Sequence, residues 1–211
     1  MPLCIGVLKE TPDGEKRVAL VPADLKAIKA LGADVLIEAG AGTASSYPDA
    51  SYVAAGAGVA TTREELLRSS QIVLFVSPQT GLAGPGKADQ LFIGMGEALS
   101  KPGPHAALAK SGASTMALEL LPRITRAQSM DVLSSMATLL GYRGVLLAAD
   151  ALPRVFPLMM TAAGTLSPAR VLVMGVGVAG LSAIATAKRL GASVLAYDVR
   201  AAAKEQVASL G

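Results

Sequence analysis

The sequence predicts an α/β fold with two lobes, each built around a mostly parallel sheet. Over roughly the first 120 residues, short apolar runs alternate with amphipathic stretches, the order expected when strands and helices follow one another. Hydrophobic residues make up 52% of the chain and charged residues 17%, which predicts a buried core rather than disorder. Ala, Val and Leu dominate the apolar residues, and such side chains suit helices packed on parallel strands.

The N-terminal lobe is predicted from its strands and two helices. Buried strands are expected at residues 4–8, 35–38, 72–76, 91–93 and 114–117. Between the first two strands lies a helix over 22–31, which Gly32 ends as a C-cap. A second helix starts after Thr61, where two carboxylates stand in the first turn. Residues 39–60 have no assignable pattern, and 79–87 is rich in Gly and Pro, which predicts a loop.

The character of the sequence changes after Leu121. Residues 128–149 contain no Pro and only two glycines, which predicts a long helix. Residues 161–168 then interrupt the pattern before a second α/β unit, with strand, helix, strand and helix expected at 170–174, 178–190, 193–197 and 201–210. The predicted domains are an N-terminal lobe at 1–125, a connecting helix and linker at 126–165, and the first part of a second lobe at 166–211.

The second lobe is predicted to be truncated at its second strand and helix. Two parallel strands alone leave an unpaired edge and an uncovered apolar face. We therefore expect residues 1–211 to be a fragment of a longer polypeptide, unless another chain supplies the remaining strands.

Composition narrows the kinds of function. The net charge is +3 with scattered basic residues, and an aromatic content of 3% argues against a base-stacking nucleic-acid surface. Cys4 is the only cysteine, which excludes an internal disulfide and a thiolate metal cage and favours a reducing compartment. His105, the only histidine, is expected to be solvated in a turn before a helix, so no metal site is predicted. The uncharged run 171–187 holds three glycines in its middle, so we predict no transmembrane segment, and residues 1–9 predict no signal peptide.

The strongest local signal is the motif Gly175-Val176-Gly177-Val178-Ala179-Gly180, which follows a predicted strand and opens a predicted helix. Gly175 permits a tight turn, Gly177 lets the backbone approach a pyrophosphate, and Gly180 permits close packing of helix on strand. The free N–H groups at the helix start, around Val178 and Ala179, would hold the phosphates. The motif predicts a dinucleotide-binding, Rossmann-like lobe, and the alternative is a glycine-rich turn without a cofactor.

Asp198 supplies the second half of this fingerprint. It ends the next predicted strand about twenty residues downstream, where an acid accepts hydrogen bonds from the adenosine ribose. Such a carboxylate repels a 2′-phosphate, so NAD(H) is the predicted cofactor. Val199 and Arg200 complete the predicted cofactor contacts, although Arg200 could also receive a 2′-phosphate and so leaves NADP(H) open.

Several segments resemble the alpha subunits of proton-translocating NAD(P) transhydrogenases, in the alanine dehydrogenase/transhydrogenase family. The likeness covers the whole chain and is most specific from Pro122 to Arg143, which contains Arg123-Ile124-Thr125-Arg126-Ala127-Gln128-Ser129-Met130-Asp131. The resemblance implies a domain that binds NAD(H) between two lobes and exchanges hydride directly with NADP(H) held by a partner domain. It also implies a peripheral position on the cytoplasmic side of the bacterial inner membrane. The implied partners are an NADP(H)-binding beta subunit, a membrane proton-channel domain and a second copy in a homodimer.

Residue by residue, the resemblance assigns the catalytic positions to Arg123, Gln128, Asp131 and Ser134, which would grip the nicotinamide end. Hydride transfer between two nicotinamides moves no proton, so the protein has to supply placement rather than an acid or a base. Arg123 and Gln128 can hydrogen-bond a carboxamide oxygen, and Asp131 can accept a bond from the carboxamide NH₂. The other interpretation of these residues is an ordinary helix N-terminus with solvated charges.

Two alternative functions compete with transhydrogenation. An alanine dehydrogenase-like enzyme needs a lysine after the strand at 74–78 and a histidine after the strand at 92–96, and neither is present. Arg17, which would bind a substrate carboxylate, is common to both families. A non-catalytic NAD-binding module would keep the glycine motif but would have no use for Arg123 or Gln128. As a fragment, the chain is expected to bind NAD(H) poorly and to be inactive alone.

Overall fold

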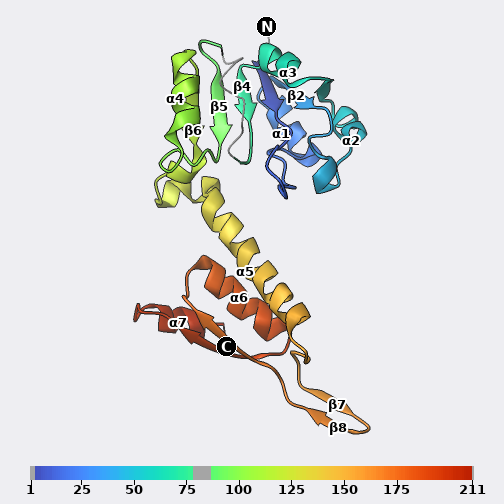
Figure 1. Ribbon diagram of the computed structural model, residues 1–211, viewed down its shortest axis with the longest axis vertical. Helices are drawn as coiled ribbons and strands as arrows, with labels where there is room; N and C mark the ends of the chain where they lie inside the picture. Colours follow the sequence, from blue (N-terminus) through green and yellow to red (C-terminus); the bar gives the residue numbers. More distant parts are fainter. Residues whose placement is uncertain (1–2, 78–86, 211) are drawn as a thin grey trace. The chain divides into compact units, whose positions relative to one another are not determined.

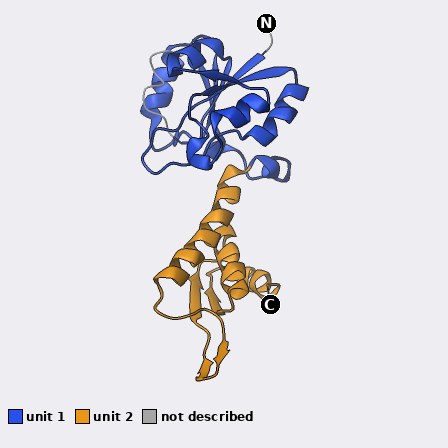
Figure 2. Ribbon diagram, turned by 90° about the vertical axis from the view of Figure 1, so that its right-hand side faces the viewer, with its two compact units in different colours: residues 1–130 blue, residues 131–211 orange. Residues whose placement is uncertain are grey.

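The computed structural model describes residues 3–77 and 87–210, so most of the loop predicted at 79–87 lies outside the described residues. Contacts between residues divide the chain into two compact units, residues 1–130 and 131–211 (Figure 2). The long helix belongs to the second unit in this division, whereas the sequence placed it in a connecting segment at 126–165. The predicted domain bounds stay a prediction.

The first unit contains a six-stranded parallel sheet with the order β3-β2-β1-β4-β5-β6 (Figure 1). Its strands are β1 (Leu3–Val7), β2 (Ala33–Glu38), β3 (Gly58–Ala60), β4 (Ile72–Leu74), β5 (Leu91–Gly94) and β6 (Ser114–Ala117). The predicted α/β fold with a mostly parallel sheet is therefore confirmed. The order of the strands reverses between β1 and β4, and such a switch point leaves a crevice at the carboxyl ends of the strands.

Helices cover both faces of this sheet. They are η1 (Pro22–Asp24), α1 (Leu25–Ala30), η2 (Thr43–Ser45), α2 (Asp49–Ala54), α3 (Arg63–Ser69), α4 (Pro102–Lys110), η3 (Leu118–Leu120) and η4 (Thr125–Met130). The neighbouring residues Val73 and Leu74 of β4 pack into different apolar clusters, because successive side chains of a strand point to opposite faces. The cluster that contains Val73 includes side chains of α3 and α4, and the other includes side chains of α1 and α2.

The segment that the sequence left unassigned, 39–60, contains η2, α2 and β3. Its short helix depends on contacts that are distant in sequence: the Asp49 carboxylate accepts the Gly40 N–H at 3.0 Å, and the buried Tyr52 hydroxyl donates to the Leu20 carbonyl at 2.9 Å. Burial raises the pKa of Tyr52 to about 12. The start of α3 was better marked in the sequence, since the Thr62 hydroxyl accepts the Glu65 N–H at 3.2 Å as an N-cap.

The second unit is built on two parallel strands and three helices. Its elements are α5 (Val132–Ala151), β7 (Met159–Thr161), β8 (Gly164–Leu166), β9 (Arg170–Met174), α6 (Val178–Arg189), β10 (Ser193–Tyr197) and α7 (Ala203–Ala208). Strands β9 and β10 pair from Arg170–Ser193 to Met174–Tyr197. Ile184 of α6 and Ala203 of α7 cover one face of this pair, where they pack near Val173.

The other face of the β9–β10 pair is apolar and open. Side chains at alternate positions remain exposed there, with exposed fractions of 61% for Leu172, 76% for Met174, 52% for Leu195 and 62% for Tyr197. The sequence predicted an uncovered apolar face for two strands of this kind, and the described residues leave this face without a cover.

Helix α5 packs closely on α6 in the second unit. A Cβ on Gly141 would collide with the Ala179 carbonyl oxygen and lie 2.9 Å from the Ser182 Cβ, so glycine is what lets the two helices approach. The Ser182 hydroxyl donates to the Thr138 carbonyl at 2.7 Å across the same contact. Among the described helices, only α5 is long and apolar enough to cross a membrane, with 11% of its apolar stretch buried. Length and composition are weak evidence for a span, and the sequence analysis did not single out this helix.

Two predictions around α5 are wrong in detail. The helix begins at Val132 rather than at residue 128, because residues 125–130 form the tighter 3-10 turns of η4 and Asp131 caps α5. The interruption expected at 161–168 is partly an antiparallel hairpin, in which Thr161 pairs with Gly164. The Thr161 hydroxyl accepts the Ala163 N–H at 3.2 Å and donates to the Gly164 carbonyl at 3.0 Å, which closes the turn.

Candidate nucleotide-binding site

The glycine turn lies at the surface of the second unit, where β9 ends. Gly175 adopts a φ of +92°, a left-handed conformation that favours glycine, and its N–H donates to the Tyr197 carbonyl of β10 at 2.8 Å. A Cβ on Gly175 or on Gly177 would meet no described atom within 4 Å. The turn therefore presents bare backbone to open space rather than to a packed interior.

Gly180 has the opposite surroundings. A Cβ at this position would collide with the Gly175 carbonyl oxygen and lie 2.9 Å from the Gly175 carbonyl carbon. The first turn of α6 thus rests directly on the glycine turn, the close packing of helix and strand that the third glycine of such a motif permits.

The N-terminus of α6 has no side-chain cap. Gly177 is the N-cap residue, and its carbonyl accepts the Leu181 N–H at 2.9 Å. The N–H groups of the first helical residues, Val178 and Ala179 among them, have no partner within the helix and point toward the glycine turn. Together with the helix dipole, these groups form a place for an anion.

Asp198 follows β10 and is bonded to the glycine turn. Its carboxylate accepts the Val176 N–H at 2.7 Å, and it accepts the backbone N–H of Arg200 at 2.8 Å. The Arg200 side chain adds bonds at 3.0 Å from Nε and 3.1 Å from Nη2, and it also donates to the Val176 carbonyl at 3.0 Å. The bonds from Arg200, and then the bond from Val176, hold the pKa of Asp198 well below its usual range. The intervening Val199 is 86% exposed.

A cavity of about 490 Å³ lies beside this pair of charged residues. Asp198, Arg200 and Lys204 supply its charged groups, and the apolar part of its lining includes Ala196 and Val207. An apolar pocket with a few charged groups at one side is the usual form of a site for a small organic ligand. The sequence pointed to Asp198 and Arg200, but it did not indicate Lys204, which sits one helical turn further on.

The residues predicted to grip the nicotinamide are divided between the two units. In the second unit, the Asp131 carboxylate accepts the Ser134 N–H at 2.9 Å and the Ser134 hydroxyl at 2.7 Å. Asp131 is therefore the N-cap of α5, which is the ordinary structural role considered for it. Arg123 and Gln128 belong to the first unit, where both are exposed at the surface.

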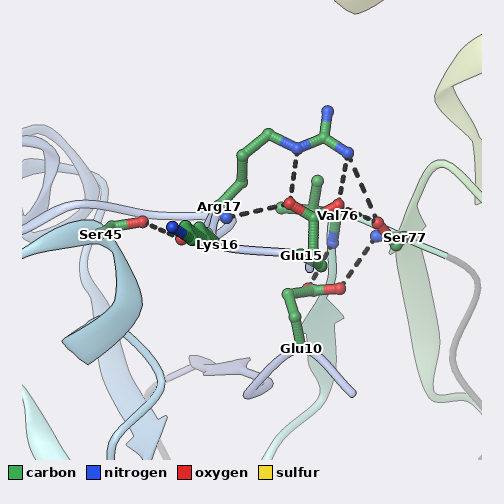
Figure 3. Close-up of polar contacts among 7 residues, drawn as sticks. All are labelled: Glu10, Glu15, Lys16, Arg17, Ser45, Val76 and Ser77. Atoms are coloured by element: carbon green, nitrogen blue, oxygen red, sulfur yellow. Dashed lines mark hydrogen bonds and ion pairs between the residues drawn. The ribbon is translucent and has the colours of Figure 1, made fainter. Parts of the chain in front are cut away.

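A second polar cluster marks the switch point of the first unit, between the ends of β1 and β4 (Figure 3). The Glu10 carboxylate spans this crevice, since it accepts the N–H groups of Val76 at 2.7 Å and Ser77 at 3.0 Å. Burial raises the pKa of Glu10, although the two backbone bonds act in the opposite direction.

Arg17, the residue common to both candidate families, is held by Glu15 in the same cluster. Its Nε and Nη2 donate to the two Glu15 oxygens at 2.8 Å and 2.6 Å, and the Ser77 hydroxyl donates to the second oxygen at 2.5 Å. These bonds, led by those of Arg17, lower the pKa of Glu15 to about 2. Sequence reasoning missed Glu15 and Ser77, and the only signal for the pair was an acid two residues before Arg17.

The prediction of a solvated His105 in a turn is wrong. Helix α4 already begins at Pro102, because proline is well suited to the first helical position, and His105 lies within it, half-buried. Its Nε2 lies 2.9 Å from the Gly96 carbonyl and its Nδ1 lies 3.4 Å from the Thr115 hydroxyl. Within 3–77 and 87–210, no group of three or more His, Cys, Asp or Glu side chains is placed to hold a metal ion.

Comparison with known proteins places both units in one family. Residues 6–140 match the family model for the N-terminal domain of alanine dehydrogenase/PNT, and residues 144–211 match its C-terminal domain. An NAD(P) transhydrogenase subunit alpha of Rhodospirillum rubrum is 49% identical over 214 residues, which cover 98% of this chain and 56% of the relative. The crystal structure of transhydrogenase from Sinorhizobium meliloti has a TM-score of 0.94 at 48% identity and covers 99% of this chain and 62% of that one. An alanine dehydrogenase of Mycolicibacterium smegmatis is 30% identical over 202 residues, 93% of this chain and 54% of its own length.

Proposed function

The chain belongs to the alanine dehydrogenase/PNT family, and from this premise we propose that it is the NAD(H)-binding part of an NAD(P) transhydrogenase. The chain spans slightly more than half the length of the Rhodospirillum relative, so the activity concerns the assembled protein. The proposed reaction is direct hydride transfer between NAD(H) on this chain and NADP(H) on a partner domain, coupled to proton translocation by a membrane partner.

The observation that carries the proposal is the bare backbone of the glycine turn at the uncapped start of α6. A Cβ on Gly175 or Gly177 would project into the space that a pyrophosphate needs, and neither residue has one. The N–H groups at Val178, Ala179 and Gly180 would hold the phosphate oxygens, which places the cofactor across the end of β9. Asp198 stands on the next strand, at the place from which an acid reaches the adenosine ribose.

The nicotinamide end is assigned to Arg123, Gln128, Asp131 and Ser134. A bound nicotinamide supplies the carbon that gives or takes the hydride, and no side chain has to move a proton in that step. The guanidinium of Arg123 and the amide of Gln128 would fix the carboxamide, while Asp131 and Ser134 would border the same group from the start of α5. Placement of the two nicotinamides is the whole contribution that these residues would make.

Partners and location follow from the same premise. The relative from Rhodospirillum is named as a subunit alpha, which supports an assembly with a beta subunit that holds NADP(H). We propose a homodimer at the cytoplasmic side of the bacterial inner membrane, bound to a membrane proton-channel domain. An alanine dehydrogenase-like activity ranks second, because Arg17 is paired with Glu15 and the identity to the mycobacterial alanine dehydrogenase is 30%, against 49% to the transhydrogenase subunit.

Hydride exchange in the assembled protein tests the proposal. With NADH and an NADP⁺ analogue, Arg123→Ala and Gln128→Ala should each lower the exchange rate by about 10- to 100-fold, since a misplaced nicotinamide loses its alignment. Arg126→Ala is the matched control, because Arg126 is exposed in the same helix η4 and should change the rate by less than about 2-fold. NADH binding without any exchange would favour the non-catalytic module, and the absence of NADH binding would reject the proposed site.

A further inference from the structure

We infer that Arg200 occupies the ribose-binding edge of Asp198 in the free chain, and that it must release this carboxylate before an adenosine ribose can bind. The inference rests on the proposed function and concerns the specificity of the same site. It starts from the hydrogen bonds that Asp198 makes.

The Asp198 carboxylate is fully engaged. One oxygen accepts the backbone N–H of Arg200 at 2.8 Å and its Nε at 3.0 Å. The other oxygen accepts the Val176 N–H at 2.7 Å and Arg200 Nη2 at 3.1 Å. An ionised carboxylate offers about four lone-pair sites, and these four bonds fill them. The two hydroxyl groups of a ribose therefore find no acceptor on Asp198 as it stands.

The Arg200 side chain is the partner that can leave. The other two donors, the N–H groups of Val176 and Arg200, belong to the backbone of the glycine turn and of the turn after β10. The Arg200 side chain is 60% exposed, whereas that of Asp198 is 9% exposed. An exposed ion pair contributes little stability, so a ligand can displace the guanidinium at a small cost. Its departure frees two acceptor sites, the number that a ribose diol requires.

The displaced guanidinium stays beside the ligand. Arg200 and Lys204 both line the cavity next to Asp198, and Arg200 is tied to the chain two residues from the acid. A 2′-phosphate would meet these cations, while an unphosphorylated ribose gains nothing from them. Arg200 thus weakens the preference for NAD(H) over NADP(H) that Asp198 alone would establish.

Binding of two adenosine ligands tests this role. ADP-ribose carries the free diol and 2′-phospho-ADP-ribose carries the extra phosphate, and calorimetry with the assembled protein compares the two. Arg200→Met keeps the apolar part of the side chain and should tighten ADP-ribose binding by about 2- to 5-fold, because no ion pair has to open. The same change should weaken 2′-phospho-ADP-ribose binding by about 10-fold, because a charge-assisted bond is lost.

Lys204→Met is the matched control, since Lys204 lines the same cavity and no described bond joins it to Asp198. It should leave ADP-ribose affinity within about 2-fold of the unchanged protein. If Arg200→Met instead weakens ADP-ribose binding, Arg200 belongs to the ribose site and the inference is overturned. If neither ligand binds any variant, the inference and the proposed function both fail.

A spectroscopic measurement separates the two proposals. In the chain labelled with ¹⁵N-arginine, the Arg200 Nε–H should be protected from exchange by Asp198, and ADP-ribose should abolish that protection. The amide signals of Val176 and Gly177 report binding at the glycine turn independently. Shifted amides together with a still protected Arg200 Nε–H would overturn the inference and leave the proposed function standing.

Discussion

The Gly175 carbonyl oxygen fills the space that a Cβ on Gly180 would need, so the first turn of α6 sits directly on the end of β9. Gly177, between these two residues in sequence, has open space at the same point. One motif therefore contains a glycine required for packing and a glycine that leaves room for a ligand.

Alanine substitutions should separate these two requirements. Gly180→Ala should lower the free energy of unfolding by about 1–3 kcal/mol, because the new methyl group forces the helix away from the turn. The gain of about 1 kcal/mol in helix propensity offsets only part of this loss. Gly177→Ala should stay within about 1 kcal/mol of the unchanged chain, as its φ of −82° suits any residue. Urea denaturation measures both, and equal destabilisation by the two changes would contradict the assignment.

The contact between α5 and α6 gives a second matched pair. Gly141→Ala should destabilise the chain by about 1–3 kcal/mol, since its Cβ would collide with the Ala179 carbonyl oxygen. Gly144→Ala lies in the same helix with no described atom within 4 Å of its Cβ, so it should stabilise the chain by about 0.5–1 kcal/mol. Opposite signs are expected in denaturant titrations, and two changes of the same sign would show that α5 is not held on α6 in solution.

Stability should fall in acid through Glu15. Its pKa in the folded chain is about 2, below the ordinary value of 4.5, so folding favours the charged form. The stability from this group is fully present above about pH 4.5 and is lost as the pH falls towards 2. Because 38% of the Arg17 side chain is exposed, water screens the pair and we expect a loss of about 1 kcal/mol.

Glu15→Gln is the control for this pH dependence. Glu10 has a raised pKa and contributes with the opposite sign, and it is present in both proteins, so their difference reports mainly on Glu15. Unfolding free energies measured from pH 5 down to about pH 2.5 should converge for the two proteins at the acid end. Parallel curves across this range would mean that the Arg17–Glu15 pair is not formed.

His105 and Gly96 should show energetic coupling. A Cβ on Gly96 would collide with the His105 ring, so Gly96→Ala should push the imidazole away from the Gly96 carbonyl and cost about 1 kcal/mol. His105→Ala removes the obstacle, and the double variant should be less destabilised than the sum of the single ones. A double-mutant cycle of unfolding free energies measures the difference, and strict additivity would exclude the contact.

Much of the fold follows from local sequence patterns. Strands β6, β9 and β10 have the bounds predicted for them, because breakers flank each apolar run. Helix α2 was not predicted, since its six residues depend on Gly40 and Leu20 from elsewhere in the chain. The start of α5 was misplaced because residues 125–130 have helical composition, and the Asp131 cap decides where regular α-helix begins.

The candidate site was predictable to a similar extent. The glycine turn and Asp198 could be found because their spacing is fixed by strand, turn and helix. The pairing of Asp198 with Arg200 could not be foreseen, because side-chain rotamers decide it. The bonds of Glu10 to Val76 and Ser77 cross 66 and 67 residues of sequence, and they exist only because β1 and β4 are neighbours in the sheet.

The open apolar face of β9 and β10 affects how any preparation of this chain will behave. Dyes such as ANS become fluorescent on exposed apolar surface, and Leu172, Met174 and Tyr197 offer such a surface in the folded state. Strong dye fluorescence would therefore accompany native secondary structure and cooperative unfolding, without any molten state. The same surface favours self-association at high protein concentration, so light scattering should accompany every binding titration.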